Sequence, residues 1–367
     1  ISEWEVLDSA GYYLPYTGSQ VSVYKALRSS NDIGYQDLSA YLQDTWEISA
    51  EHASWFISAG LRATYWCFNP VLFISPRTTF SVQPDWEKDM MFHLSWGYYY
   101  QPPFYKEMRL PDGSVNYGIE PQRSIHLLLG GDYLFNAWDR PFKLTAEFYY
   151  KWLNNLIPYK IENVRIEYAG ENLAKGYAMG FDMKLNGEFV PGAESWMTIS
   201  LLQTREDMPG DSVYEWVDGK QVLTEAGYYP RPTDQLFSFG LYFQDYLPNN
   251  PDYKVHLNAF FGSGIPLSQP IDGLYYTKYR MRPYRRIDIG FSKVLKREYD
   301  VLKPGNPFRH FNNIWISGEI FNLLAIENEA SYSWIRTISD QEGVPALFGV
   351  PNKLTGRRFN IKLTAVF

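Results

Sequence analysis

The chain has 367 residues, of which 45% are hydrophobic and 20% charged, so a globally disordered protein is excluded. It has no run of about 18 apolar residues, which excludes a transmembrane helix. The formal net charge of −7 argues against a nucleic-acid-binding protein, and the single cysteine, Cys67, excludes a disulfide framework or a cysteine-based zinc site.

Hydrophobic residues recur at every second position along most of the chain. Between residues 142 and 152, every even position is apolar or aromatic, and Lys143, Thr145 and Glu147 are among the residues between them. This period of two predicts half-buried β-strands, separated by turns rich in glycine and proline. In chain order, the strands are expected near residues 1–8, 35–49, 54–68, 71–83, 87–100, 122–136, 140–154, 176–190, 194–205, 234–247, 253–264, 282–297, 312–324 and 356–367.

The lengths of these fourteen segments favour a barrel in a membrane. Many have 12 to 15 residues, whereas strands of soluble proteins average about 5–6 and a tilted strand crosses a bilayer with about 9–11. Short connections at 50–53, 84–86, 137–139, 191–193 and 248–252 alternate with long ones at 9–34, 101–121, 155–175, 206–233, 265–281 and 325–355, and only the links at 69–70 and 298–311 break the alternation. Since outer-membrane barrels have short periplasmic turns and long extracellular loops, we predict an all-β, transmembrane, antiparallel up-and-down β-barrel.

A soluble β-sandwich or propeller is the alternative, because its strands alternate in the same way. In a membrane barrel, aromatic residues near the strand ends would form two interfacial girdles, with Trp46, Trp55, Tyr65, Trp66, Tyr98, Phe135, Trp152 and Phe189 as candidates. The polar face would line the lumen, where each charge could also serve in a structural cross-strand pair. The charges on this face are Arg62, Arg77, Lys143, Glu147, Asp182, Lys184, Arg286, Asp288, Glu319, Arg358 and Lys362.

Several segments resemble TonB-dependent outer-membrane receptors, chiefly those of Bacteroidetes-type bacteria. They are 40–46 (AYLQDTW), 59–62 (AGLR), 74–77 (ISPR), 98–106 (YYYQPPFYK), 284–291 (YRRIDIGF) and 319–324 (EIFNLL). The last segment, 356–367 (GRRFNIKLTAVF), resembles the terminal strand of Gram-negative outer-membrane barrels. That resemblance implies recognition by the barrel-assembly machinery through Phe359, Ile361, Leu363, Ala365 and Phe367.

The family resemblance implies a barrel of twenty-two strands with an N-terminal plug. We therefore expect residues 1–367 to be the C-terminal portion of such a barrel, roughly strands nine to twenty-two, with the plug and TonB box outside this chain. The start at Ile1 fits either removal of a leader or a longer parent protein. An open sheet edge in lipid leaves backbone groups unpaired, so 1–8 and 356–367 should pair with strands that the sequence does not contain. A self-closed barrel of fourteen strands is the competing interpretation.

The function implied by the resemblance is TonB-dependent active uptake of a scarce nutrient, such as a siderophore, glycan, peptide or cobalamin, across the bacterial outer membrane. The implied partners are the lipid bilayer, the plug, the TonB complex, the barrel-assembly machinery and, as a further candidate, a surface lipoprotein. Nucleic acid is not expected. A passive diffusion channel and a surface-exposed binding or adhesion module are the alternatives.

No enzyme motif is found, and we expect no catalytic residue, metal or cofactor. The five histidines, His52, His93, His126, His256 and His310, are scattered singly and none belongs to an H-E-x-x-H motif. Strand parity places His93 and His126 on the lumen face without a serine and aspartate partner.

Aromatic and basic residues in the long loops are the candidates for substrate binding, because ring faces beside arginine or lysine suit sugars, peptides and chelates. They could equally pack the loops together. The candidates are Tyr99, Phe104, Tyr105, Lys106 and Arg109 near loop 101–121, Trp216, Tyr228, Tyr229 and Arg231 in loop 206–233, and Tyr275, Tyr276 and Arg280 in loop 265–281.

Overall fold

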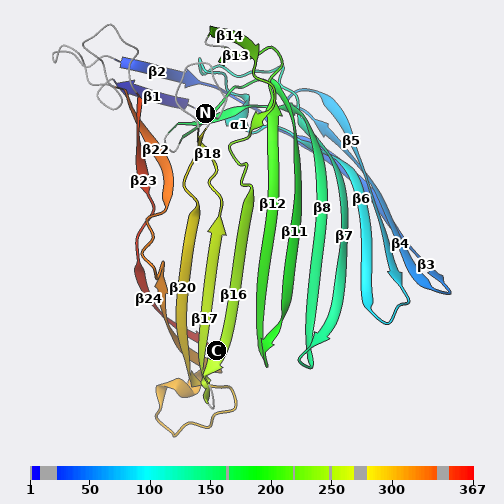
Figure 1. The fold of residues 1–367 in the computed structure, drawn as a ribbon, viewed down its shortest axis with the longest axis vertical. Coiled ribbons are helices and arrows are strands. Elements are labelled where there is room, and N and C mark those ends of the chain that lie inside the picture. Colours follow the sequence, from blue (N-terminus) through cyan, green and yellow to red (C-terminus); the bar gives the residue numbers. More distant parts are fainter. Residues whose placement is uncertain are drawn as a thin grey trace.

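The computed structural model describes residues 2–8, 23–162, 165–217, 220–247, 250–267, 279–336 and 347–367. Long antiparallel strands stand side by side in one curved wall (Figure 1). They are β3 (Asp37–Ala50), β4 (Ala53–Trp66), β5 (Val71–Pro84), β6 (Asp89–Gln101), β7 (Gln122–Ala137), β8 (Arg140–Leu156), β11 (Ala174–Val190), β12 (Ala193–Asp207), β16 (Phe237–Leu247), β17 (Asn250–Gly262), β20 (Tyr284–Lys296), β21 (Asn313–Phe321) and β24 (Arg358–Val366). The short β15 (Tyr229–Pro230) pairs with β12 and completes a fourteen-stranded sheet. The all-β prediction is confirmed.

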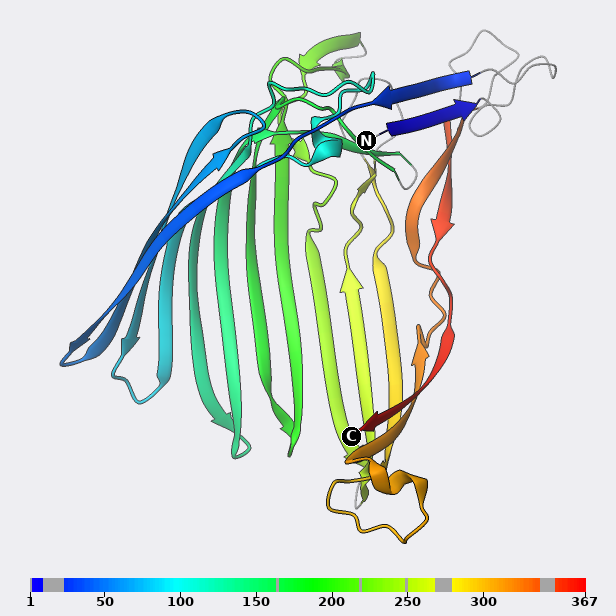
Figure 2. The same ribbon diagram turned by 180° about the vertical axis from the view of Figure 1, so that it is seen from behind.

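The wall is an up-and-down meander, because each of its long strands pairs with the next one along the chain. The pairing of β7 with β8, for example, runs without a bulge from Arg123↔Asn154 to Ala137↔Arg140. The sheet does not close on itself, since β3 and β24 lie at its two ends (Figure 2). The self-closed barrel of fourteen strands is therefore not the arrangement found here.

Tight turns and long loops lie at opposite ends of the wall, as predicted, and we call these the turn end and the loop end. The turn between β7 and β8 has Trp138 and Asp139 at φ 53° and 59°, the left-handed pair that a two-residue type I′ hairpin requires. Both irregular links are also found. The β4–β5 link is short at the loop end, and the β20–β21 link, which contains the 3₁₀ helix η1 (Pro307–His310), extends beyond the turn end (Figure 1).

The loop end carries small hairpins and one helix. The paired strands are β1 (Ser2–Asp8) with β2 (Val23–Ser30), β9 (Tyr159–Glu162) with β10 (Arg165–Tyr168), β13 (Ser212–Val217) with β14 (Lys220–Glu225), β18 (Pro266–Leu267) with β19 (Tyr279–Arg280) and β22 (Glu329–Arg336) with β23 (Leu347–Lys353). The helix α1 (Tyr105–Met108) has a single turn. Within the described residues, no helix is long and apolar enough to cross a membrane.

The structure corrects the prediction that segment 1–8 is the first strand of the wall. Residues 2–8 of the predicted segment 1–8 form a strand, β1, but it pairs with β2, from Ser2↔Ser30 to Asp8↔Val23, in a hairpin outside the wall. The prediction missed β2 because it assigned residues 9–34 to one loop. Asn31, which follows β2, donates hydrogen bonds from Nδ2 to the Tyr105 hydroxyl (3.1 Å) and the Gly113 carbonyl (2.9 Å). The hairpin is thereby tied to loop 102–121, and β3 is left as the edge of the wall.

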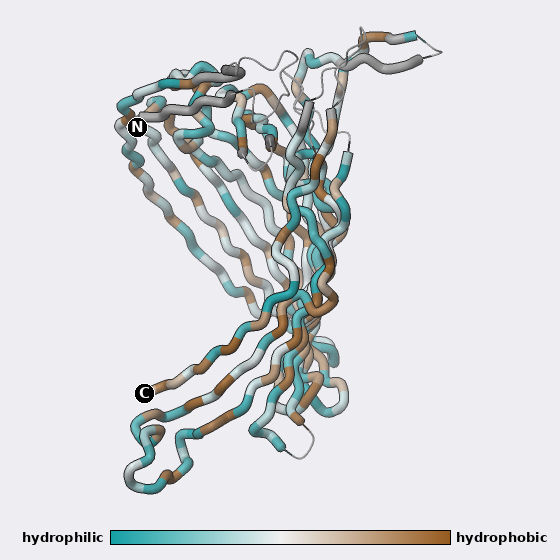
Figure 3. Tube along the Cα trace, turned by 90° about the vertical axis from the view of Figure 1, so that its left-hand side faces the viewer, coloured by the Kyte–Doolittle hydropathy of each residue, from teal (hydrophilic) through white to brown (hydrophobic). Residues whose placement is uncertain are grey.

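One face of the wall is apolar and exposed. The alternation is visible along the strands as brown and teal positions in turn (Figure 3). Large apolar side chains that share this face and remain exposed include Leu72, Ile74, Leu94, Trp96, Leu129, Phe148, Trp152, Leu201, Phe291, Phe359, Ile361 and Leu363. Soluble monomers rarely expose an apolar patch of more than a few hundred Å². An apolar sheet face of this extent favours contact with lipid over contact with water.

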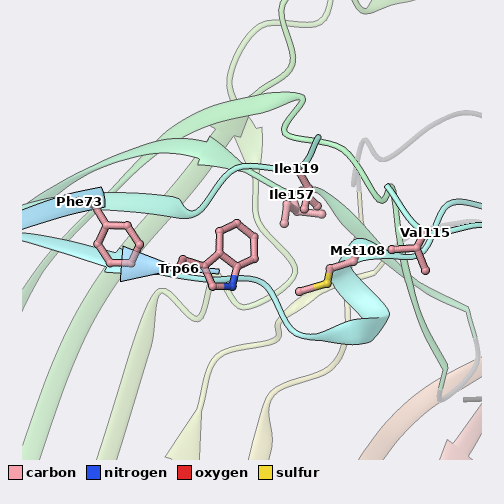
Figure 4. Close-up of a cluster of buried hydrophobic side chains, with 6 residues drawn as sticks. All are labelled: Trp66, Phe73, Met108, Val115, Ile119 and Ile157. Carbon is pink, nitrogen blue, oxygen red and sulfur yellow. The ribbon is translucent and has the colours of Figure 1, made fainter. Parts of the chain in front are cut away.

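The buried apolar core lies at the loop end on the opposite, polar face. It consists of Trp66, Phe73, Met108, Val115, Ile119 and Ile157, drawn in Figure 4. Loop 102–121 thus packs onto the ends of β4 and β5. This corrects the expectation for Trp66, which was a candidate for an interfacial girdle. Trp66 pairs with Asp37 and Val71, has the parity of the polar face and is 0% exposed.

Candidate functional site

Three basic side chains lie in one cross-strand row on the polar face. Arg77 of β5 is opposite Gly97 of β6, Gly97 is opposite His126 of β7, and His126 is opposite Lys151 of β8. Residues directly opposite one another in a sheet project from the same face. We call Arg77, His126 and Lys151 the basic row.

An aromatic ring links two members of the basic row. The guanidinium carbon Cζ of Arg77 lies 4.3 Å from the centroid of the Tyr99 ring, a cation–π distance. Tyr99 in turn stacks on His126, with ring centroids 4.1 Å apart and planes 23° from parallel. Gly97 makes room for this stack, because a Cβ there would lie 3.1 Å from Cγ of Arg77 and 3.2 Å from Cε2 of Tyr99.

A cavity of about 550 Å³ opens on the polar face beside the basic row. Its lining combines guanidinium groups with hydroxyl groups and comprises Arg62, Arg77, Ser58, Ser75, Thr79, Ser95 and Tyr99, among others. Arg62 donates from Nη2 to Ser39 Oγ (3.2 Å) and from Nε to Thr64 Oγ1 (3.4 Å). Within the part of the chain that the structure describes, ion pairs between basic side chains and carboxylates do not include Arg62, Arg77 or Lys151.

Nearer the turn end, the polar face carries two similar acid–imidazole pairs. His93 of β6 reaches across Gly130 of β7 to Glu147 of β8, with Nε2 and Oε1 3.4 Å apart. His256 of β17 reaches across Gly290 of β20 to Glu319 of β21, with the same atoms 3.6 Å apart. In both cases the middle strand has a glycine where any side chain would separate the pair.

The predicted substrate-binding residues of loop 101–121 surround α1. Phe104 is exposed and its ring meets that of Tyr168 edge-on at 5.4 Å. Lys106 is exposed as well. Tyr105 is half-buried, and Arg109 forms an isolated β-bridge with Val115. Only Phe104 and Lys106 therefore present side chains freely to solvent at this point.

The predicted residues of the next two loops are divided between the surface and a buried network. Tyr228 is 46% exposed, with its ring tilted against Tyr177, whereas Tyr229 is 1% exposed. Arg231 Nε contacts Oε2 of the buried Glu206 at 3.0 Å, and Arg280 pairs with the buried Asp234. Arg231 thus ties its loop to the end of β12, and Arg280 ties β19 to the segment before β16. Trp216 lies on β13, but its side chain, like Tyr275 and Tyr276, lies outside the described residues.

The sequence interpretation found only part of the basic row. It placed Arg77 and His126 on the lumen face and proposed Tyr99 for substrate binding, but it did not bring them together and did not single out Lys151. The signal was strand parity combined with register, since Gly97 is opposite both Arg77 and His126, and His126 is directly opposite Lys151. No group of three or more histidine, cysteine, aspartate or glutamate residues fit to hold a metal occurs within the described ranges.

Glu107 should make the fold of loop 102–121 dependent on pH. Its carboxylate accepts hydrogen bonds from the Phe104 amide and from Gln122 Nε2, both at 3.1 Å. Burial nevertheless raises the pKa of Glu107 above its ordinary value. A raised folded-state pKa means that the contribution of this group is fully present below the unfolded pKa and is lost as pH rises through the folded value.

We therefore expect the amides of residues 104–108 to be better protected from hydrogen exchange, after correction for intrinsic rates, near pH 4 than near pH 7. The Glu107→Gln variant should show the same protection at both pH values. Equal pH dependence in the variant and in the unchanged protein would show that another group controls this loop.

Comparisons with known proteins give one family and a set of solved structures. Residues 2–300 match the family described as "TonB dependent receptor-like, beta-barrel". Among solved structures, the copper transporter OprC is 13% identical with a TM-score of 0.57, over 97% of this chain and 51% of that chain. The outer membrane transporter YddB from Escherichia coli is 14% identical with a TM-score of 0.56, over 95% and 47% respectively. A mutant of the ferric enterobactin receptor PfeA from Pseudomonas aeruginosa is 13% identical with a TM-score of 0.56, over 97% and 47%.

No curated protein matches the chain. At these identities the solved structures establish a shared fold, and the chain spans about half of their length. The family match covers most of the chain, and the antiparallel wall with its long loops at one end agrees with it. The chain belongs to the TonB-dependent receptor-like β-barrel family.

Proposed function

We propose that this chain forms barrel wall and extracellular loops of a receptor that takes up a scarce nutrient across the bacterial outer membrane by TonB-dependent active transport. One observation carries the proposal: a family-matched antiparallel wall that presents an apolar face on one side and a polar, charged face on the other. In a membrane the apolar face contacts lipid and the polar face lines the lumen. The long loops then lie outside the cell and the tight turns in the periplasm.

The proposal also concerns the strands and the plug that would complete the barrel. Both edges of the wall, β3 and β24, are exposed along their length. An open edge in hydrocarbon leaves amide and carbonyl groups without partners, each at a cost of several kcal/mol. We infer that β3 and β24 pair with strands of the same receptor outside this chain, and that its plug lies against the polar face. The coverage of about half of the similar solved structures supports this inference.

The partners follow from the same arrangement. TonB would act through the plug, so no residue of this chain needs to contact it. The barrel-assembly machinery would recognise the last strand, where Phe359, Ile361, Leu363, Ala365 and Phe367 alternate on one face and are exposed. A surface lipoprotein above the loops and the Bacteroidetes-type branch of the family both stay predictions.

Growth of a receptor-dependent strain tests the uptake function. Strains with and without the full-length receptor that contains this chain would be supplied with ferric siderophores, glycans, peptides or cobalamin as the limiting nutrient. We expect one class to support growth only with the receptor, and we expect deletion of TonB to abolish that growth. Growth that needs the receptor but not TonB would instead establish a passive diffusion channel, the second candidate. Receptor-independent growth on all classes would contradict both.

A further inference from the structure

The basic row and the cavity beside it gather basic side chains without carboxylates. Arg62 and Arg77 line the cavity, and His126 and Lys151 continue the row beside it. Within the described residues, Arg62, Arg77 and Lys151 have no carboxylate partner. Some other basic side chains of the polar face do have such partners, for example Lys143 with Asp132 at 3.2 Å and Arg286 with Asp288 at 2.7 Å. Like charges gathered without counter-charges repel one another, so the cluster is stabilised when an anion binds.

The acidic groups nearest the basic row already have other partners. On β8, Glu147 is four residues from Lys151, about 13 Å along the strand, and its carboxylate contacts His93. In the same cross-strand row on β12, the Thr204 amide donates to Asp234, which pairs with Arg280. Within the described residues, the guanidinium of Arg77 and the ammonium of Lys151 are therefore left without a carboxylate partner.

The position of the basic row fits a solute arriving from outside the cell. His126 is the fifth residue of β7, and Lys151 is the sixth from the end of β8, both counted from the loop end. At about 3.3 Å per residue, the row lies roughly 15 Å below the start of the wall. The apolar cluster with Trp66 and Met108 includes residues of loop 102–121 and lies nearer the loop end than the row, since its member Phe73 precedes Arg77 by four residues on β5. A solute that has passed the loops would meet the basic row as the first concentrated charge on this part of the wall.

The volume and the lining groups of the cavity indicate the chemical class of its ligand. Its volume of about 550 Å³ falls in the range of about 300–1,000 Å³ that small-molecule sites have. Guanidinium groups bind carboxylate and phosphate through paired hydrogen bonds, and Ser58, Ser75, Thr79 and Ser95 supply hydroxyl donors around them. The ring of Tyr99, fixed between Arg77 and His126, adds a flat apolar surface.

We propose that Arg62, Arg77, His126 and Lys151, with Tyr99, form an anion-binding site on the lumen wall for a small solute that carries carboxylate or phosphate groups. This assignment rests on the proposed uptake function, because it names the chemical class of the transported solute. The same groups could instead receive an acidic side chain of the plug. We commit to the solute, since Arg62, Arg77 and Tyr99 of this site line a cavity of small-molecule size together with hydroxyl groups. The experiment distinguishes a bound solute from a bound plug side chain.

Calorimetric titration of the purified full-length receptor tests the site. The probes are tricarballylate, inorganic pyrophosphate and the neutral sugar raffinose. We expect both anions to bind, raffinose not to bind, and binding to weaken when ionic strength rises from 0.1 to 0.5 M. Arg77→Gln and Lys151→Gln should each weaken anion binding at least tenfold, which corresponds to ~1.4 kcal/mol. The control Lys184→Gln removes one positive charge from the same face, in the row of Thr145 and Thr198, and should change binding less than twofold.

Every other outcome of the calorimetric titration overturns the solute assignment. Binding that appears only after the plug is deleted would show that a plug carboxylate occupies the site. Absence of binding with and without the plug, or equal weakening by Lys184→Gln, would show that the basic row is not an anion site. Heat-modifiable migration of every variant on a gel verifies that the barrel is folded. A growth result that depends on the receptor but not on TonB would disprove active uptake while leaving the binding result intact.

Discussion

Replacement of Asp234 by alanine should destabilise the loop end by about 1–3 kcal/mol, the cost of leaving a buried hydrogen-bond donor unsatisfied. Asp234 is 1% exposed and accepts a hydrogen bond from the Thr204 amide at 2.6 Å. Arg280 pairs with its carboxylate and donates to its carbonyl oxygen at 2.7 Å. A single side chain thus joins β12, the segment before β16, and β19. Its removal leaves the Thr204 amide unsatisfied, whereas the exposed Arg280 guanidinium keeps the carbonyl oxygens of residues 234 and 264.

Hydrogen exchange at the Thr204 amide is the measurement. We expect its protection to fall by about tenfold or more in Asp234→Ala, while amides in the middle of β11 keep theirs. The matched control is Glu327→Ala, which removes the acid of an exposed loop ion pair with Lys353. Exposed pairs contribute about 0–1 kcal/mol, so this control should leave protection nearly unchanged. Equal effects of the two substitutions would refute the buried-network interpretation.

This network explains why loop residues are hard to interpret from sequence. Arg231 and Arg280 have the composition of a binding surface, an arginine next to tyrosines, and the sequence interpretation proposed them for substrate contact. Their carboxylate partners, Glu206 and Asp234, are 25 and 46 residues away along the chain. No local pattern reveals such a pairing, because it depends on how the loop segments fold back onto β12 and onto each other.

The wall was predictable because its signal is local and repeated. Strands from β3 to β24 follow the period of two closely, and turn positions such as Trp138 and Asp139 lie between the predicted strands. The sequence specifies the register between neighbouring strands less directly than it specifies the strands themselves. Once neighbouring strands are aligned, parity places Arg77, His126 and Lys151 on one face, but only the pairing through Gly97 brings them into one row. The hairpin of β1 and β2 was missed because a two-stranded ribbon at the loop end has the same local pattern as the edge of a wall.

Gly290→Ala should separate His256 from Glu319 and destabilise the wall by about 1–3 kcal/mol, the usual cost of overpacking. A Cβ at this position would lie 2.2 Å from Cε1 and 2.4 Å from Nε2 of His256, so the imidazole has to turn away from Glu319. The carboxylate of Glu319 would keep the hydrogen bond from Asn360 Nδ2 at 2.9 Å. The loss of stability therefore comes from the displaced imidazole of His256 and its packing. Gly318→Ala on the neighbouring strand is the matched control, because a Cβ there has nothing within 4 Å.

A double-mutant cycle in urea unfolding of the full-length receptor decides whether the imidazole is the obstacle. If it is, His256→Ala should remove most of the cost of Gly290→Ala, giving a coupling free energy of about 1 kcal/mol or more between the two positions. Additive effects would place the cost of Gly290→Ala in the backbone of β20 instead. Because Gly130 holds the same position between His93 and Glu147, Gly130→Ala with His93→Ala should repeat the coupling. A repeated coupling would establish that the glycine on the middle strand is what allows an imidazole and a carboxylate to meet across three strands of this wall.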